Sequence, residues 1–136
     1  MKVVIDTCVY IDFLNKSKYE EIFYERTMFR FLSPVVAMEL RAGAQNHKDI
    51  AALDRLFATY STAHRVVSLS ANSFLKVGEV LQKLSKKYSG HSFSAMANDV
   101  LIALSAASIG ATLVTSNKKD FEKIATCLNF NCHFLK

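Results

Sequence analysis

Acidic residues stand at three places where the surrounding sequence is apolar. Asp6 directly follows the run Val3-Val4-Ile5, which is typical of a strand buried on both faces. Glu39 has Val35-Val36 one helical turn before it and Ala42-Gly43 one turn after it. Its carboxylate would therefore lie on an apolar face of small residues.

Asp99 shows the same pattern more strongly. Ala95-Met96 precedes it by one turn, Ile102-Ala103 follows it by one turn, and no Lys or Arg occurs between Lys87 and Lys118. A buried carboxylate without a partner costs several kcal/mol, so it would take up a proton or bind a cation.

Further oxygen ligands follow a second apolar run. Asn117, Asp120 and Glu122 come after residues 111–115, and ligands of open α/β sheets bind at the carboxyl ends of strands. Asp12 would reach the site of Asp6 or face water. Asp120 would be a further oxygen ligand of the site or would cap a helix. Glu122 is predicted to lie on the solvated surface.

Each acid also has a structural interpretation, either as a helix cap or as solvated surface. Several acids that converge from separate elements favour a functional site instead. An all-oxygen cluster favours Mg²⁺ or Mn²⁺ over zinc or copper. With such ions, the natural chemistry is phosphoryl transfer to water.

Motifs for competing chemistries are missing. The sequence has no Walker loop, no G-x-G-x-x-G and no G-x-S-x-G, which argues against nucleotide-binding loops and serine hydrolases. Cys127, Cys132 and His133 lack the C-x₂-C spacing and the second ligand pair of a zinc site. These cysteines are predicted to be small buried thiols.

Composition describes an ordinary globular chain with an uneven charge distribution. It has 136 residues, is 51% hydrophobic and carries a net charge of +5. Residues 1–54 contribute −1 and residues 55–136 contribute +6, so the second part could offer a surface for phosphates. Three cysteines, with neither a secretory signal nor a long apolar stretch, predict a reduced, cytoplasmic protein that does not enter a membrane.

Short apolar strands are predicted to alternate with amphipathic helices, and this alternation favours an α/β sandwich with helices on both faces of a parallel sheet. Residues 89–92 read as a loop. Strands are predicted near residues 3–5, 29–32, 66–69, 111–115 and 130–135. Helices are predicted near residues 7–14, 19–28, 34–43, 48–60, 71–88, 95–109 and 120–128.

Four segments, taken in order, resemble the motifs of PIN-domain ribonucleases. They are D-T-C-V-Y-I-D at residues 6–12, P-V-V-A-M-E-L at 34–40, N-D-V-L-I-A at 98–103 and T-L-V-T-S-N-K-K-D-F at 112–121. The resemblance covers nearly the whole chain. Its compact length and spacing are most similar to VapC-type toxins of type II toxin–antitoxin systems.

This resemblance implies a PIN-like three-layer sandwich, with a short parallel sheet flanked by helices, as a single domain over residues 1–136. It also implies a Mg²⁺- or Mn²⁺-dependent endoribonuclease that acts as a toxin on an RNA substrate. A homodimer and a cognate antitoxin protein are the implied partners.

The resemblance also assigns roles to the acids. Asp6, Glu39 and Asp99 would be the core catalytic acids, with Asp6 and Asp99 as the metal ligands. Many relatives have aspartate where Asn117 stands, so the fourth acidic role falls to Asp120 or is shared with Asn117 through water. That departure motivates an alternative, a catalytically weak PIN module that binds RNA or a protein partner.

Other residues would support the site. Thr7 and Thr115 would do so through hydrogen bonds. One group of lysines, either Lys118, Lys119 and Lys123 or Lys83, Lys86 and Lys87, would contact RNA phosphates and make binding salt-dependent. The alternative for each lysine group is an ordinary solvated helix surface.

Overall fold

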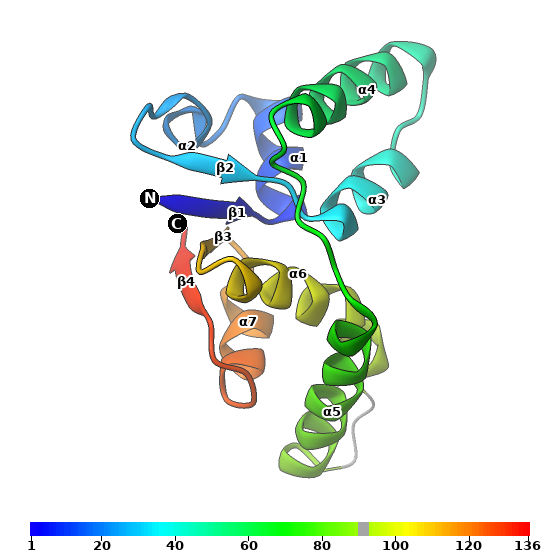
Figure 1. Ribbon diagram of the computed structural model, residues 1–136, viewed down its shortest axis with the longest axis vertical. Coiled ribbons are helices and arrows are strands. Elements are labelled where there is room, and N and C mark those ends of the chain that lie inside the picture. Colours follow the sequence, from blue (N-terminus) through cyan, green and yellow to red (C-terminus); the bar gives the residue numbers. More distant parts are fainter. Residues whose placement is uncertain (90–92) are drawn as a thin grey trace.

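Four parallel strands form the central sheet of the computed structural model, which describes residues 1–89 and 93–136 (Figure 1). The strand order is β2-β1-β3-β4. The strands are β1 (Lys2–Ile5), β2 (Phe29–Phe31), β3 (Thr112–Thr115) and β4 (Asn131–Phe134). Most of the loop predicted at residues 89–92 lies outside the described residues.

Strand β1 lies between β2 and β3, and the side chains of its residues 3–5 are buried, whereas Lys2 at its start is exposed. Val3 and Val4 have no exposed surface, and Leu113 of β3 is equally buried. Ile5 pairs with Val114, and the chain continues this pairing through a hydrogen bond from the Asp6 N–H to the Val114 carbonyl at 2.9 Å. The carboxyl ends of β1 and β3 therefore lie side by side.

Helices cover both faces of the sheet. α1 (Thr7–Lys16) and α2 (Glu20–Tyr24) lie on one face, and α6 (Ala97–Ser108) and α7 (Lys118–Ala125) lie on the other (Figure 1). The remaining helices are α3 (Pro34–Ala42), α4 (His47–Thr62), α5 (Ala71–Lys87) and a short 3₁₀ turn, η1 (Ser94–Met96). α4 and α5 extend away from the sheet toward opposite ends of the molecule (Figure 1).

Local capping explains where several helices begin. The Ser33 hydroxyl accepts a hydrogen bond from the Val35 N–H, and Pro34 occupies the first helical position of α3. Ser70 caps α5 in the same way. Asp6 caps α1, and Asn117 caps α7. Two of these caps therefore stand at the carboxyl ends of β1 and β3.

The strand predicted at residues 66–69 is wrong. Val66 makes a single parallel bridge to Leu32, and Val67 donates a hydrogen bond to the Leu32 carbonyl. Val66 is 40% exposed whereas Val67 is buried, so this short run has no stripe of buried residues to extend the sheet. The chain instead turns into α5.

Several helix boundaries also differ from those predicted. α7 begins at Lys118 instead of Asp120, because Asn117 provides the cap, and it ends at Ala125 instead of residue 128. α2 ends at Tyr24 instead of extending to residue 28. Within the described residues, no helix has the length and apolar character needed to cross a membrane.

Candidate active site

Asp6 lies at the carboxyl end of β1 and is almost completely buried, with 4% of its surface exposed. Its carboxylate accepts hydrogen bonds from the Thr7 N–H at 2.8 Å, the Thr115 hydroxyl at 2.7 Å and the Cys8 thiol at 3.3 Å. Burial raises the pKa of Asp6, the three hydrogen bonds oppose that rise, and the Glu39 charge adds to it. The side chain is therefore costly to ionise and firmly oriented.

Glu39 is brought to the same place by α3. Its carboxylate accepts a 2.7 Å hydrogen bond from the Thr7 hydroxyl, so one residue links Glu39 to the cap of α1. α3 is tied to α6 by the buried Ser33 and Ser105 hydroxyls, which are 2.9 Å apart. Thr7 and Thr115, the two threonines predicted to support the site, each donate a hydrogen bond to one of the acids.

Asp99 stands in the first turn of α6 and is half-buried. Loss of solvent, followed by the negative charges of Asp6, Asp120 and Glu39, raises the pKa of Asp99 to about 7. Because all three other acids act on Asp99, the four carboxylates form one electrostatic cluster. We call Asp6, Glu39, Asp99 and Asp120 the acidic cluster.

Asp120 is held in the cluster by Asn117. The Asn117 side-chain amide donates to the Asp120 carboxylate at 3.1 Å, and the Asn117 carbonyl oxygen accepts from the Asp120 N–H at 3.4 Å. The Asn117 N–H donates in turn to the Thr115 hydroxyl at 3.0 Å. Asn117 therefore orients the carboxylate of Asp120 and is itself tied to Thr115.

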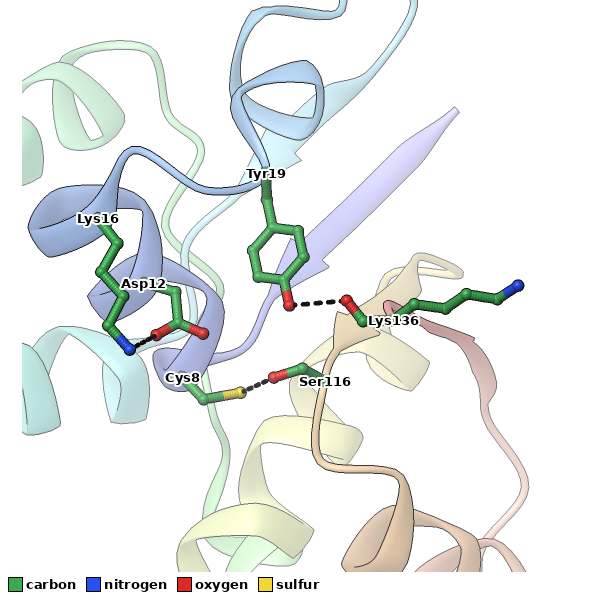
Figure 2. A network of polar contacts seen from close by, with 6 residues as sticks. All are labelled: Cys8, Asp12, Lys16, Tyr19, Ser116 and Lys136. Carbon is green, nitrogen blue, oxygen red and sulfur yellow. Dashed lines mark hydrogen bonds and ion pairs between the residues drawn. The ribbon is translucent and has the colours of Figure 1, made fainter.

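Cys8 and Ser116 are part of the site that sequence reasoning missed. The Cys8 sulfur lies 3.3 Å from the Ser116 hydroxyl, and Figure 2 shows the two side chains pointing toward each other. Burial and the Asp6 charge raise the pKa of the Cys8 thiol, which keeps it protonated and able to donate to Asp6. The sequence did offer one indication that Cys8 belongs to the site, because Cys8 directly follows Asp6-Thr7.

Asp12 does not join the acidic cluster. It pairs with Lys16 at 3.8 Å, one turn farther along α1 (Figure 2). The Tyr19 hydroxyl nearby donates to the Lys136 carbonyl at 3.2 Å and so connects the segment after α1 to the end of β4 (Figure 2). Of the two interpretations of Asp12, the structure supports a surface role.

The acidic cluster has no basic partner in the described part of the chain. The ion pairs within residues 1–89 and 93–136 join neighbours on single helices, and none involves the cluster. In the same residues, no three acids, histidines or cysteines lie close enough to hold one ion as they stand. Carboxylate oxygens are nevertheless the ligands that Mg²⁺ and Mn²⁺ prefer, so the chemistry of the donors fits such a cation.

Lys118 and Lys119 are exposed at the start of α7, directly before Asp120. Lys118 forms an ion pair with Glu122 at 3.7 Å, which confirms the surface interpretation of Glu122. The cysteines are all unpaired.

The sequence matches the family model of the PIN domain over residues 3–126. The chain belongs to the PIN-domain family. The predicted PIN fold, a parallel sheet flanked by helices, is thereby confirmed. No curated protein matches the chain by sequence.

Several solved structures share the fold of this PIN domain. VapBC2 from Rickettsia felis, bound to a DNA fragment from its promoter, is 22% identical with a TM-score of 0.73, and the match covers 100% of both chains. VapBC-1 from nontypeable Haemophilus influenzae is 24% identical with a TM-score of 0.70, over 98% of both chains. FitAcB from Neisseria gonorrhoeae is 20% identical with a TM-score of 0.69, over 98% of this chain and 96% of that one.

Proposed function

We propose that this PIN domain is a metal-dependent endoribonuclease that cleaves RNA phosphodiester bonds. The observation that carries the proposal is the convergence of four carboxylates from separate elements, with the pKa of Asp99 raised to about 7 by burial and by the other three. Clustered acids destabilise one another, and such strain at a site is the expected signature of a bound cation or a catalytic role.

The residues of the acidic cluster divide into two proposed roles. Asp6 and Asp99 would hold Mg²⁺ or Mn²⁺, and Glu39 and Asp120 would complete the negative site. When bound, the cation lowers the pKa of a water molecule and stabilises charge on the phosphate. Thr115 and Thr7 fix Asp6 and Glu39 through their hydroxyls.

Lys118 and Lys119 are proposed to bind phosphates of the RNA next to the scissile bond. Both are exposed and directly precede Asp120 in sequence. Positively charged side chains on phosphates position a nucleic acid without reading its sequence. This arrangement supports a nucleic-acid substrate without choosing a particular sequence.

The direct test is RNA cleavage by the purified protein with Mg²⁺ or Mn²⁺, and with EDTA. Asp6→Asn and Asp99→Asn should each reduce the rate by roughly 1000-fold. Asp12→Asn is the matched control, because it makes the same chemical change on α1 at a residue paired with Lys16. Equal cleavage by the Asp99→Asn protein, or in EDTA, would contradict the proposal.

The alternative is a catalytically weak PIN module that binds RNA or a protein partner. It is favoured by Asn117, which replaces an acid found in many relatives with an amide that holds Asp120 instead. RNA binding without cleavage, in either Mg²⁺ or Mn²⁺, would select this alternative.

We further propose that the protein is the toxin of a toxin–antitoxin pair and that its antitoxin docks between α1, α3 and α4. A groove of about 440 Å³ lies there, with Glu39 and Asp49 among its lining residues. The groove is otherwise mainly apolar, and two of its side chains, Ile11 and Leu14, are 44% and 51% exposed. An apolar segment that carries a basic side chain would complement it.

The test of this partner is co-purification with the product of the reading frame directly upstream. Leu14→Lys should abolish co-purification and leave RNA cleavage unchanged, because Leu14 lies in the groove outside the acidic cluster. Unchanged binding of that product by the variant would contradict the assigned surface.

We also propose a homodimer through α3 and α5. An open hollow of about 600 Å³ is lined there by apolar side chains such as Met38 and Phe74, with no charged residue in its lining. These two side chains are 53% and 57% exposed, and exposed apolar patches mark association surfaces. Phe74→Asp should give a monomer in light scattering, whereas a wild-type monomer would contradict the dimer.

A further inference from the structure

Four lysines stand on α7 and at the end of α5, two helices that contact each other. They are Lys119, Lys123, Lys87 and Lys83, which we call the lysine tract. We infer that this tract binds the phosphate backbone of RNA on one side of the cleaved bond. The inference rests on the proposed function and deepens it, because it makes the substrate an RNA that extends several nucleotides beyond the cleavage site.

The tract begins beside the acidic cluster. Lys119 directly precedes Asp120, and Lys123 follows Lys119 by four residues. Residues at this spacing share one side of a helix, about 6 Å apart along its axis. Lys118 is partly neutralised by Glu122, whereas no ion pair in the described residues joins Lys119 or Lys123 to an acid.

The tract passes from α7 to α5 at Tyr88. The Lys123 ammonium lies 5.5 Å from the centre of the Tyr88 ring, and Tyr88 directly follows the last residue of α5. This contact joins two basic segments that are 30 residues or more apart in sequence. The sequence alone offered them as separate candidates.

The end of α5 continues the positive surface. Lys83 and Lys87 are exposed and are again four residues apart. Helical geometry places them on the opposite flank of α5 from Phe74, whose side chain lines the apolar hollow with α3 and α6. Glu79 lies one turn before Lys83, but it pairs with Lys76 at 3.4 Å, and no acid occurs between residues 80 and 89.

The chemistry of the tract favours a polyanion with regularly spaced charges. The lysines lie one turn apart on two adjoining helices. Such spaced positive charges fit the repeated phosphates of a nucleic-acid backbone better than they fit a single small anion. Such contacts carry no sequence information, and they position the strand. Since the tract starts beside Asp120, the bound strand would lead directly into the proposed site of cleavage.

The experiment uses the full chain and two charge-matched variants. Lys83→Glu with Lys87→Glu alters the tract. Lys48→Glu with Arg55→Glu makes the same change in net charge on α4, at the opposite end of the molecule (Figure 1). Binding of a fluorescent 20-nucleotide RNA is measured by anisotropy in EDTA, so that cleavage does not interfere.

We expect the tract variant to bind about 10-fold more weakly and the α4 variant to bind like the wild type. Replacing Lys83 and Lys87 by Gln should lower the slope of log affinity against log salt by about 1.4, which corresponds to two contacts with a single strand. With Mg²⁺ or Mn²⁺, the tract variant should show a higher KM on the long RNA and an unchanged kcat. It should cut a four-nucleotide RNA, too short to span the tract, as well as the wild type does.

Two results would contradict the inference that the lysine tract binds RNA. One is wild-type RNA affinity in the Lys83→Glu, Lys87→Glu protein. The other is equal weakening by both variants, which would assign the effect to net charge alone. A wild-type protein that binds RNA through the tract but cuts none of it would leave the inference standing and reject the proposed endoribonuclease.

Discussion

Asp6 and Asp99 belong to the same acidic cluster but lie in different surroundings. Asp6 is tied down at the ends of β1 and β3 by three hydrogen bonds that oppose the effect of burial on its pKa. Asp99, on α6, faces three like charges, and no hydrogen bond to its carboxylate occurs among the described residues. Loss of solvent, followed by the repulsion of these like charges, raises the pKa of Asp99 to about 7.

The difference indicates that the two sides of the site are prepared for a cation in different ways. The strand-end side is preorganised, because its hydrogen-bond donors already satisfy the carboxylate of Asp6. The α6 side stays electrostatically strained until a positive charge arrives. Changes on the two sides should therefore move the stability of the cation-free protein in opposite directions.

Thr115→Val should have the largest effect on stability. The Thr115 hydroxyl is fully buried, donates to Asp6 and accepts from the Asn117 N–H. Valine fills the same space but leaves two buried polar groups without a partner, so we expect a loss of about 2 kcal/mol in the free energy of unfolding. Urea denaturation in EDTA measures it, with Thr126→Val, at an exposed hydroxyl, as the control.

Asp99→Asn should change the free energy of unfolding in the opposite direction. Removing this charge relieves repulsion from Asp6, Asp120 and Glu39, so the cation-free variant should be more stable than the wild type. Because Asp99 is only half-buried and solvent screens it, we expect a gain of about 1 kcal/mol. A less stable Asp99→Asn protein in EDTA would show that the α6 side is not strained.

The same gain should depend on pH. The pKa of Asp99 is raised in the folded state to about 7 from its ordinary value of 3.8, so the folded chain binds this proton more tightly than the unfolded chain. The Asp99 contribution to stability is therefore complete below pH 4 and is lost as the pH rises to about 7. In EDTA, the advantage of Asp99→Asn should grow between pH 4 and pH 7 and then level off, as followed by thermal unfolding.

Thr7→Val should have the smallest effect. It removes the 2.7 Å hydrogen bond to Glu39 at a half-buried position, and we expect a loss of about 0.5 kcal/mol. Thr59→Val removes a hydroxyl bonded to the Arg55 carbonyl on the surface of α4 and serves as the control. A loss as large as that of Thr115→Val would mean that Glu39 is held as firmly as Asp6.

Sequence reasoning located the acids because their neighbours are apolar. Asp6 and Asp99 could be singled out from strand ends and helical spacing, since both features are local. The role of Asn117 as the residue that orients Asp120 was not predictable, because it depends on side-chain directions in the turn after β3.

Other features were unpredictable because they depend on long-range packing. The hydrogen bond between the Cys8 thiol and the Ser116 hydroxyl joins residues that are 108 positions apart in sequence. The run at residues 66–69 has the composition of a strand, yet Val66 pairs with its neighbour Leu32 at a single bridge. Composition does not reveal how far a neighbouring strand extends.

The hydrogen bond from Thr115 to Asp6 spans 109 residues, and this separation has a consequence for synthesis on the ribosome. Asp6 emerges early in translation, but its orienting hydroxyl arrives only after β3 has been made. Contacts of such long range form late in folding. A partly synthesised chain would therefore lack a completed site, and the proposed RNA-cleaving activity would appear only after most of the molecule has left the ribosome that made it.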